Sequence, residues 1–572
     1  MNAEDGTSLA RVRAAYEANE AAGRPEIWIA MRDRGQAEAE ARELDAAAAA
    51  GRSLPLRGLV VAVKDNIDVA GLPTTGGLPS AEFLPAEDAP AVARLRAAGA
   101  VVLGKTNLDQ FATGLVGTRS PHGAVRNAWR PERISGGSSS GSAVAVALGI
   151  VDLGLGTDTA GSGRVPAALN GIVGIKPTLG LVPARGMMDA CRPYDTITVF
   201  ARDLPTAVAG ARTMTGPDDR DPLSRARPAG ARLAASAAPV VAVPDEAGLA
   251  PLAPEARAAW DAARERLAAV AELRTIDVAP LLGAARLLYE GAIVAGRYAA
   301  AGRFVDAADG DAAGLDPTVA GIVRGARAAS GWEYVRDRAA LDRARLVARD
   351  LLDGCDALVL PTAPGHPTIA EVEADPVGVN SWMGTYTNFV NLLDLAAVSV
   401  PADPRERDGF GISVIARPFE DQVAVDLAAR YLGVAEPEYA EDGIELAVFG
   451  AHLRGQPLNG ELRALGARFL GEAATSDEYR LYALATRPPK PGLVRVADGG
   501  AAIRGERWAL PPAGLAAFLA ALPEPMTLGP VRLADGRTVV GFGCAPAALE
   551  GARDITEFGG WAAYLASTPA GG

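Results

Sequence analysis

The sequence contains few of the side chains that bind metals or form disulfide frameworks. Cysteine and histidine occur three times each, as Cys191, Cys355, Cys544, His122, His366 and His452. The cysteines are far apart and show no metal-type spacing, and no phosphate loop or dinucleotide fingerprint follows a predicted strand. We therefore expect no metal and no cofactor. Cysteine usage of this kind favours a reducing cytoplasm as the location.

Positive charge and long apolar runs are also scarce. The 56 Lys and Arg residues are outnumbered by 69 Asp and Glu residues, which gives a formal net charge of −13. This balance gives no electrostatic support for nucleic-acid binding. Residues 1–23 lack the apolar core of a signal peptide, and no stretch approaches the roughly 20 apolar residues of a membrane span. We expect neither nucleic acid nor a membrane as a partner.

Among the basic residues, lysine is rare. Only four of the 56 are lysines, namely Lys64, Lys105, Lys176 and Lys490. Arginine keeps its charge in proteins, whereas a buried lysine can give up its proton. Three of the four lysines lie inside apolar or glycine-flanked motifs. This placement favours functional roles over a bias in composition.

The apolar segments that are present alternate between strands and helices. Strands are predicted at 59–63, 100–103, 240–243, 275–278 and 357–360, and helices at 89–98, from Glu255 onward, and roughly at 283–304 and 317–353. Such alternation predicts an α/β fold around a mainly parallel or mixed sheet. The polar stretch 205–233 is expected to be an exposed crossing.

The composition and the predicted secondary structure change near residue 435, which divides the chain into two predicted domains. Residues 436–445 are acidic and contain proline, which is typical of a linker. Beyond them, short strands separated by turns predict a smaller α+β domain at 446–572. The first domain is accordingly predicted at 1–435.

Two turns rich in glycine and serine flank a run of small apolar residues. The turns are GGSSSGS at 136–142 and DTAGSGR at 158–164, and they place Ser138 and Ser162 24 positions apart. A short helix at 143–148 followed by a returning strand at 151–156 would bring the two turns together. Flexible linkers are not interleaved with such apolar runs. We interpret the stretch as a site built where backbones approach closely.

The second turn has the features of a nucleophilic serine. Ser162 lies in a glycine-flanked turn between a predicted strand and a predicted helix. The backbone N–H groups of Thr159, Ala160 and Gly161 can converge on one oxygen, as an oxyanion hole requires. The residues therefore permit covalent catalysis by serine.

Activation of this serine would fall to a lysine, because no histidine lies nearby in sequence. An apolar strand ends at Lys64, and poor solvation there would favour the neutral amine. Lys64 could then accept a proton from Ser138, which would accept one from Ser162. In the alternative interpretation, Lys64 simply pairs with Asp65 or Asp68. The sequence of the strand alone does not decide between these two interpretations of Lys64.

Four ordered motifs resemble the amidase signature family: AVKDN at 62–66, GGSSSGS at 136–142, GTDTAGSGRVPA at 156–167 and GIKPT at 174–178. The resemblance covers about residues 25–430 and implies an α/β/α sandwich with a mixed central sheet. It also implies amide hydrolysis by a Ser–cis-Ser–Lys triad. In that triad Ser162 is the nucleophile that forms an acyl-enzyme, Ser138 is the bridging serine after a cis peptide bond, and Lys64 is the base.

The surroundings of the triad partly depart from the common pattern of that family. The differences fall at Ser140, Ala160 and Gly163, and they leave every triad position intact. Asp158 and Arg164 flank the nucleophile, and we expect them to form an ion pair that braces the loop.

Further segments are similar to the allophanate hydrolase branch of this family. They are TTGGLPS at 74–80, residues 105–123 and 385–402, and, near the C-terminus, VFGAHLRGQPLN at 448–459, PPKPGL at 488–493 and DITEFGGWAAYL at 554–565. The resemblance implies hydrolysis of allophanate (urea-1-carboxylate) to ammonia and carbon dioxide. That reaction is the last step of ATP-dependent urea degradation or of cyanuric acid degradation. We further expect a homodimer.

The same resemblance assigns substrate binding to Tyr289 and Arg297. These residues are eight positions apart, close to one face of a predicted helix. A small anionic amide needs a cation, and a guanidinium suits a carboxylate through paired hydrogen bonds. In the alternative, Arg297 is an ordinary exposed helical arginine.

The C-terminal domain resembles the γ-glutamylcyclotransferase-like fold, with a glycine turn at 449–452. His452 is a candidate for a second activity on N-carboxycarbamate, the first product. A structural histidine in a turn, or a domain that serves only in assembly, are the alternatives. For the whole chain, two further functions stay open: hydrolysis of another small amide, or the role of a glutamine-dependent amidotransferase A-type subunit.

Overall fold

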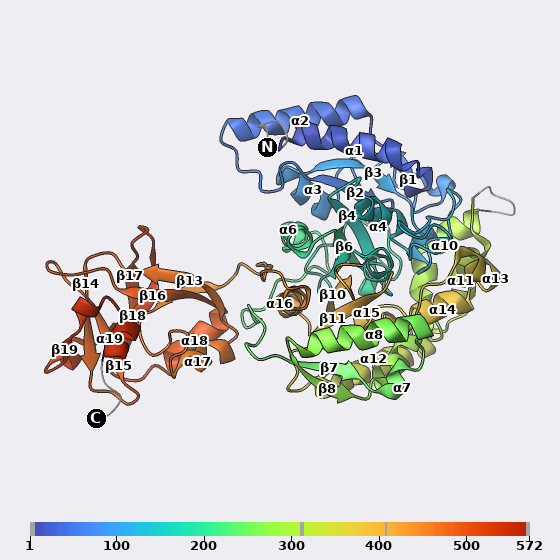
Figure 1. Ribbon diagram of the computed structural model, residues 1–572. Coiled ribbons are helices and arrows are strands. Elements are labelled where there is room, and N and C mark those ends of the chain that lie inside the picture. The colour runs from blue at the N-terminus through green and yellow to red at the C-terminus, as the bar shows by residue number, and fades with distance from the viewer. Residues whose placement is uncertain (1–5, 309–313, 407–408, 568–572) are drawn as a thin grey trace. The chain divides into compact units, whose positions relative to one another are not determined.

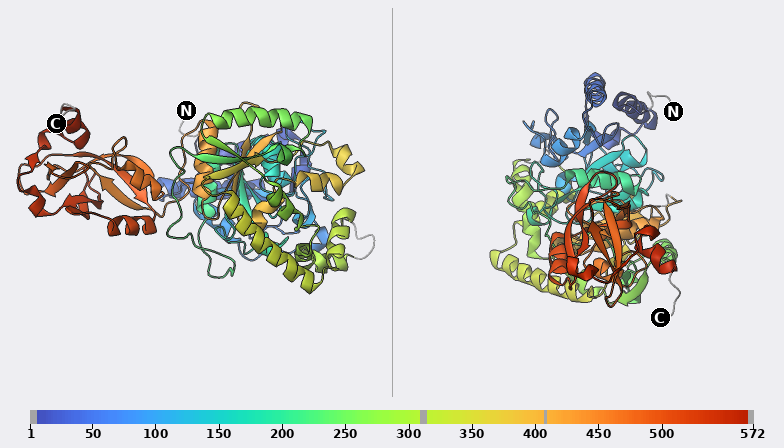
Figure 2. Two further views of the ribbon diagram at one scale, coloured as in Figure 1. Left: turned by 90° about the horizontal axis from the view of Figure 1, so that it is seen from below. Right: turned by 90° about the vertical axis from the view of Figure 1, so that its left-hand side faces the viewer.

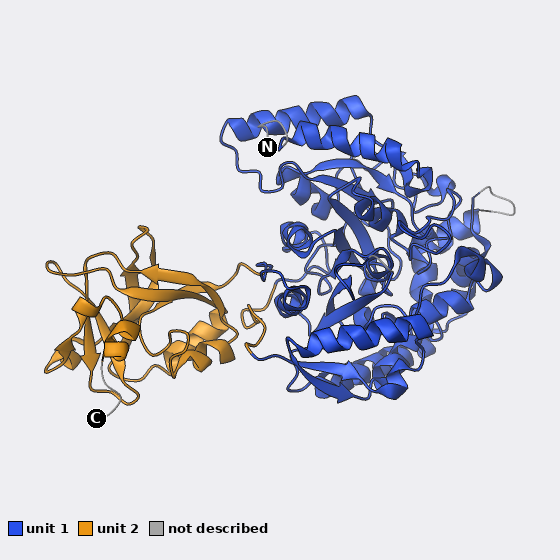
Figure 3. Ribbon diagram, viewed as in Figure 1, with its two compact units in different colours: residues 1–226, 238–439 blue, residues 227–237, 440–572 orange. Residues whose placement is uncertain are grey.

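The computed structural model describes residues 6–308, 314–406 and 409–567. They divide into two units (Figure 3): residues 1–226 with 238–439, and residues 227–237 with 440–572. The short segment 227–237 therefore belongs with the C-terminal unit, although it precedes that unit by some two hundred residues. Nothing in its sequence indicates this. Each unit has its own hydrophobic core.

The first unit is built on one mixed sheet of 11 strands among the described residues (Figure 1). In spatial order these are β1 (Trp28–Met31), β3 (Val101–Thr106), β2 (Val60–Lys64), β4 (Leu153–Asp158), β6 (Thr196–Ala201), β5 (Val173–Lys176), β10 (Ala396–Pro401), β11 (Gly411–Ala416), β9 (Ala357–Pro361), β7 (Val240–Pro244) and β8 (Glu272–Ile276). The predicted α/β class with a mixed sheet is confirmed.

The pairing of three strands determines where the polar residues gather. β2 pairs in parallel with both β3 and β4. Parallel neighbours end at the same edge of a sheet, so Lys64 at the end of β2 lies near Thr157 and Asp158 at the end of β4. All three strands are fully buried.

Helices cover both faces of this sheet. The α-helices described in the first unit are α1 (Ser8–Ala22), α2 (Arg34–Ala49), α3 (Pro90–Ala97), α4 (Ser140–Ala147), α5 (Val165–Leu169), α6 (Leu204–Met214), α7 (Glu246–Leu249), α8 (Pro254–Ala268), α9 (Ala279–Arg286), α10 (Ala295–Ala307), α11 (Pro317–Ala326), α12 (Gly331–Leu351), α13 (Ile369–Ala374), α14 (Gly378–Met383), α15 (Asn388–Leu392) and α16 (Asp421–Leu432). Figure 2 shows α8 and α12 on opposite sides of the sheet, which makes the sandwich.

Close packing of α4 on β4 positions the serine turns. A Cβ atom at Gly154 would lie 2.8 Å from the carbonyl oxygen of Ser142, so this strand position tolerates only glycine. The opposite face of the same strand packs on α6, where Gly210 lies against Leu153. The helix and returning strand predicted here are confirmed, with the strand two residues later than expected.

The expectation of an exposed crossing at 205–233 is wrong for its first part. Residues 204–214 form α6, which starts at the N-cap Asp203 and buries Leu204, Val208 and Met214. An Asp N-cap followed by Pro205 is a helix start signal. The signal was obscured because the polar, proline-rich residues beyond 215 dominate the composition of the whole stretch.

The second unit contains two sheets. The larger has the order β13 (Arg468–Ala474), β16 (Arg504–Leu510), β12 (Ile444–Val448), β18 (Thr538–Cys544) and β17 (Met526–Arg532), and the smaller β15 (Lys490–Arg495), β14 (Tyr479–Leu484) and β19 (Arg553–Asp554). Its helices are α17 (Asn459–Ala464), α18 (Pro512–Ala520) and α19 (Trp561–Ser567). The α+β character expected of this domain is observed. In the described parts of both units, no helix has the length and apolar surface to cross a membrane.

Candidate active site

The two serine turns meet, as the sequence predicts. Ser138 lies just before α4 and Ser162 just after β4, and their hydroxyl oxygens are 3.0 Å apart. Both residues are buried. The peptide bond between Gly137 and Ser138 is cis.

Lys64 completes a chain of three hydrogen-bonded groups. Its Nζ donates to Ser138 Oγ and to Thr157 Oγ1, each at 2.7 Å. The side chain is fully buried, and this burial lowers the pKa of Lys64 from 10.5 to about 7, although the charges of Asp109 and Asp158 act in the opposite direction. A substantial fraction of the amine is therefore neutral at pH 7 and can accept a proton.

The alternative pairing of Lys64 with a neighbouring aspartate is wrong. Asp65 lies 3.5 Å from the ammonium of Lys105 instead. Asp68 accepts a hydrogen bond from Thr74 Oγ1 at 2.9 Å. Lys105 thus has a structural role here, whereas Lys64 forms its hydrogen bonds with Ser138 and Thr157.

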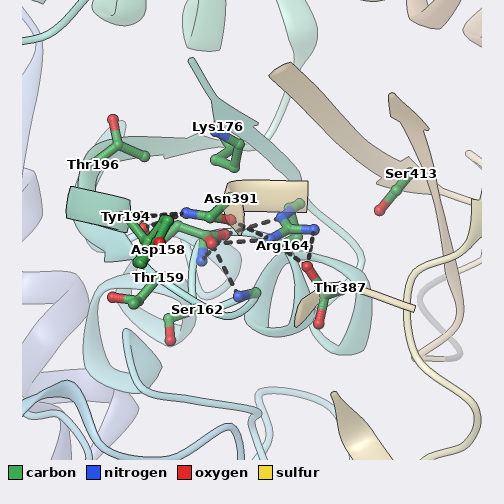
Figure 4. Close-up of polar contacts among 12 residues, drawn as sticks. Asp158, Thr159, Ser162, Arg164, Lys176, Tyr194, Thr196, Thr387, Asn391 and Ser413 are labelled. Atoms are coloured by element: carbon green, nitrogen blue, oxygen red, sulfur yellow. Dashed lines mark hydrogen bonds and ion pairs between the residues drawn. The ribbon is translucent and has the colours of Figure 1, made fainter. Parts of the chain in front are cut away.

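An ion pair braces the loop that carries Ser162, as expected. Arg164 lies 2.9 Å from Asp158, and both side chains are fully buried (Figure 4). Burial alone would raise the pKa of Asp158, but the charge and hydrogen bond of Arg164, together with the Lys176 charge and the N–H of Gly163, outweigh it and the pKa is lowered. Arg164 also donates to the carbonyl of Thr387 and to Asn391 Oδ1. The turn is thereby tied to α15.

The carboxylate of Asp158 accepts a hydrogen bond from one of the three N–H groups that the sequence predicts as donors to an oxyanion. Gly161 N–H donates to Asp158 Oδ1 at 2.9 Å, so in this structure it is not directed at an oxyanion. Within the described residues, the N–H groups of Thr159 and Ala160 have no protein acceptor. The hydroxyl of Thr159 donates to Asp195 at 2.5 Å, which orients that residue.

Asp109 is a residue of the site that the sequence reasoning missed. It is fully buried, and its N–H donates to the carbonyl of Ser138 at 3.2 Å. Its carboxylate accepts from the N–H groups of Val116, Gly117 and Arg119. A Cβ at Gly137 would lie 2.0 Å from this carboxylate, so only glycine fits before Ser138. Asp109 thus links the 109–119 loop to the serine turn.

Tyr289 and Arg297 lie together, but they do not share a helix. Tyr289 follows the end of α9 in a turn, and Arg297 lies near the start of α10. The helix expected over both residues is interrupted at Gly291, where the backbone is extended, and Asp337 of α12 accepts the N–H of the next residue, Ala292, at 2.7 Å. The turn still brings Arg297 Nη2 within 2.9 Å of the Tyr289 hydroxyl.

Arg297 is not an exposed helical arginine. Only 2% of it is accessible, and its other Nη atom donates to the carbonyl of Ala112 and to Thr113 Oγ1. Its buried Nε has no partner among the described residues. The Arg297 charge is also one of those that act on the pKa of Lys64, in the lowering direction. A buried guanidinium with an unused donor is thus available near the triad.

In the second unit, His452 lies at the position expected for a glycine turn. Its ring packs against Phe518 and Phe542, with centroid distances of 5.1 and 5.0 Å, and its Nε2 lies 3.0 Å from Glu461 Oε2. Burial lowers the pKa of His452 below its ordinary value. The residue lines a cavity of about 240 Å³.

His122, His366 and Lys176 are not part of the hydrogen-bonded chain of Lys64, Ser138 and Ser162. His122 and His366 lie in loops, as predicted, and burial lowers the pKa of His366 to about 4. Lys176 is buried and donates to the carbonyl of Pro177 at 2.7 Å. No group of three or more His, Cys, Asp or Glu side chains in the described ranges could hold a metal ion.

Comparisons with known proteins agree with this geometry. Residues 11–425 match the Amidase family, and residues 444–566 match the allophanate hydrolase C-terminal domain. The urea amidolyase of Lachancea kluyveri is 42% identical over 90% of this chain, which spans only 30% of that protein. The A-type subunit of the glutamyl-tRNA(Gln) amidotransferase of Roseiflexus castenholzii is 34% identical over 72% of this chain and 90% of its own length. The structure of Kluyveromyces lactis allophanate hydrolase superimposes with a TM-score of 0.85 and 38% identity, covering 98% of this chain and 97% of that one.

The burial of Lys64 predicts an acid limb in the pH dependence of amide hydrolysis. With Lys64 as the predicted base, catalysis needs the neutral amine, so kcat/KM should rise as the pH passes through about 7 and then level off. In Thr157→Val, the loss of an acceptor that stabilises the ammonium should lower the pKa of Lys64 and move this limb down by about one pH unit. Steady-state rates between acid and neutral pH measure both effects.

The matched control for this variant is Thr198→Val, because the buried hydroxyl of Thr198 has no hydrogen-bond partner among the described residues. Its pH profile should equal that of the unaltered protein. A limb that stays in place in Thr157→Val, or that moves equally in both variants, would contradict a base function of Lys64.

Proposed function

We propose that this chain, which belongs to the amidase family, hydrolyses allophanate to ammonia and carbon dioxide. The observation that carries the proposal is the buried Lys64–Ser138–Ser162 hydrogen-bond chain, whose terminal amine has a pKa of about 7. The likeness of both units to allophanate hydrolases, over nearly the full chain, supports the choice of substrate.

In the first half of the proposed reaction, Ser162 attacks the carbonyl carbon of the terminal amide. Its proton passes to Ser138, and the proton of Ser138 passes to Lys64. The N–H groups of Thr159 and Ala160 receive the oxyanion. Gly161 N–H can join them only by turning away from Asp158, to which it donates here.

In the second half, the relay runs in reverse. Lys64 returns a proton through Ser138 to the leaving nitrogen, and ammonia departs from an acyl-enzyme on Ser162. Water, deprotonated by the same relay, then attacks the acyl carbon, and N-carboxycarbamate is released as the Ser162 oxygen takes the proton back from the relay. This product takes up a proton and loses carbon dioxide to give carbamate, which takes up a second proton and breaks down to ammonia and a second carbon dioxide.

Arg297 and Tyr289 are proposed to bind the carboxylate of the substrate. A buried guanidinium is a strong partner for a carboxylate because water does not compete for its N–H groups. The unused Nε and the Nη2 bonded to the Tyr289 hydroxyl supply two donors at one place. The polar hydroxyl can shift to accommodate the ligand.

For the second unit we propose a role in the breakdown of N-carboxycarbamate, with His452 as the catalytic residue. The neutral imidazole and the cavity beside it support this role. A domain used only for assembly stays an alternative. The homodimer, the cytoplasmic location and the pathway, through urea or through cyanuric acid, also stay predictions.

The second candidate function is that of an amidotransferase A-type subunit. The likeness to the A-type subunit of the glutamyl-tRNA(Gln) amidotransferase favours it for the first unit. That likeness covers 72% of this chain, whereas the likeness to allophanate hydrolase covers 98% and includes the second unit. The isolated chain should therefore release ammonia from its own substrate without partner proteins.

The substrate is tested by the release of ammonia from allophanate, malonamide, acetamide and indoleacetamide. We expect allophanate to be preferred, and Ser162→Ala to lower its turnover by several orders of magnitude. Lys64→Arg should be nearly as inactive, because arginine keeps its proton. Turnover of another amide with none of allophanate would favour the other-amide alternative. Substantial activity of Ser162→Ala would exclude Ser162 as the nucleophile.

Carboxylate recognition is tested with Arg297→Lys. The charge is kept but the paired donors are lost, so KM for allophanate should rise about tenfold to a hundredfold while the turnover of malonamide, which has no carboxylate, changes little. Arg303→Lys, an exposed arginine on the same helix α10, is the control and should match the unaltered protein. Equal losses on both substrates would show that Arg297 has only a structural role.

A further inference from the structure

A pocket of about 620 Å³ lies in the first unit beside the start of α8, and its lining includes none of the residues of the Lys64–Ser138–Ser162 chain. This volume is within the range of small-molecule sites. One wall includes the indole of Trp382. The polar side chains of the lining are those of Arg130, Arg133, Glu255, His366 and Glu371.

Two arginines bring positive charge to this pocket. Within the described residues, the guanidinium of Arg130 has neither a hydrogen bond nor an ion pair. Arg133 donates through Nη1 to the carbonyl of His366, and its Nε lies 4.0 Å from Glu132 Oε1. Burial lowers the pKa of His366 to about 4, and the nearby charges of Arg133 and Arg130 act in the same direction. A cation without an anionic partner, beside a second cation and a neutral imidazole, suits an anion.

The first turn of α8 adds backbone donors to the same pocket. No side chain caps this helix of 15 residues, and Pro254 at its start has no N–H. The N–H groups of Glu255 and Ala256 have no backbone acceptor in the described part of the chain. Free N–H groups at the start of a helix favour a bound anion, and phosphate in particular.

The indole of Trp382 is fixed in position. Its Nε1 donates to the carbonyl of Pro251 at 2.9 Å. A Cβ atom at Gly365 would lie 2.3 Å from the indole ring, so this glycine lets the backbone pack directly against it. A fixed aromatic ring at the wall of a pocket can stack on the flat ring of a nucleobase.

Of the two carboxylates in the lining, one is available to a ligand. Glu371 Oε2 already accepts from the N–H and the hydroxyl of Thr368. Glu255 is exposed, and its carboxylate forms no hydrogen bond or ion pair with the described residues. A carboxylate of this kind is an acceptor for the hydroxyls of a ribose.

His366 connects the pocket to the turn that carries Ser138. Its Nε2 lies 2.9 Å from the carbonyl oxygen of Ile134. The N–H of Ile134 donates to the carbonyl of Pro367 at 3.2 Å. Residues 134–138 are all buried, so a displacement of His366 or of its neighbour would be passed along them to Ser138.

We propose that this pocket is a regulatory site for a nucleoside monophosphate. Arg130, Arg133 and the N–H groups at the start of α8 bind the phosphate. Glu255 accepts hydrogen bonds from the ribose hydroxyls, and the base stacks on Trp382. The inference goes beyond the proposed function and does not depend on which amide the chain hydrolyses.

Binding is tested on the full chain by isothermal titration calorimetry, with adenosine 5′-monophosphate as the probe. We expect saturable binding. Inorganic phosphate lacks the ribose and base, adenosine lacks the phosphate, and benzoate lacks the hydroxyls, so each should bind about tenfold or more weakly than the probe.

NMR of histidine labelled with ¹³C at Cε1 locates the bound probe. Adenosine 5′-monophosphate should shift the signal of His366, which lines the pocket, and should leave those of His122 and His452 in place. The variants His122→Asn and His452→Asn identify these two signals. A probe that shifts only His122 or His452 would contradict the assigned site.

Matched variants test the role of the unpaired arginine. Arg130→Met should weaken binding of the probe about tenfold or more. Arg264→Met removes an exposed cation from the same helix α8, outside the pocket lining, and should bind as the unaltered chain does. If Arg130→Met has a lowered thermal midpoint, Arg130→Lys replaces it and should also bind more weakly, because the paired donors are lost.

Regulation is tested by the rate of ammonia release with and without the probe. Saturating probe should change kcat about twofold or more, and Arg130→Met should keep the basal rate but lose this response. Absence of binding, tighter binding of phosphate or benzoate, or equal binding by Arg130→Met and Arg264→Met would overturn the nucleotide site. Binding that shifts His366 but leaves kcat unchanged would overturn the regulatory role. If the chain hydrolyses another amide and no allophanate, only the proposed substrate fails, and the same test is made with that amide.

Discussion

The desolvation of one amine is the constraint on which the rest of this site depends. Moving Lys64 out of water lowers its pKa from 10.5 to about 7, which corresponds to a penalty on the charged form of roughly 5 kcal/mol relative to water. An arginine could not be neutralised in this way. The fold meets the requirement by ending a fully buried strand at Lys64 and by giving its nitrogen only hydroxyl acceptors, Ser138 and Thr157. A carboxylate in direct contact would have kept the ammonium charged.

The charges near this amine are neutralised by one another. Asp158 is paired with Arg164, and Asp65 lies beside Lys105, so neither carboxylate is free to bind Lys64. The Asp158 carboxylate also accepts two N–H groups of the Ser162 turn. A single buried ion pair thereby holds the turn that carries Ser162 and limits the electric field at Lys64. Breaking such a pair is costly because it leaves an uncompensated charge in the interior.

The parts of this site that depend on local pattern could be predicted from the sequence. Alternating apolar segments gave the mixed sheet, and the two glycine turns around a helix and a strand placed Ser138 next to Ser162. The parts of the site that depend on distant contacts could not be predicted from the sequence. The helix expected over Tyr289 and Arg297 is interrupted at Gly291, and the N–H of the next residue is bound by Asp337, which lies far along the chain. Asp109 and Thr157 act through neighbours on other elements, and residues 227–237 join a unit to which no local feature assigns them.

As the proposed binding site of the substrate carboxylate, Arg297 would connect substrate binding to the protonation state of Lys64. In the empty site its charge contributes to the lowering of the pKa of Lys64. An anionic substrate paired with Arg297 would offset that charge, so the pKa of Lys64 in the complex should be higher than in the free enzyme. The acid limb of kcat, which reports the complex, should then lie at higher pH than that of kcat/KM, which reports the free enzyme. A neutral amide would leave the two limbs together, because it brings no charge to Arg297. The cation proposed to select the substrate would thus also adjust the pKa of the proposed base, Lys64.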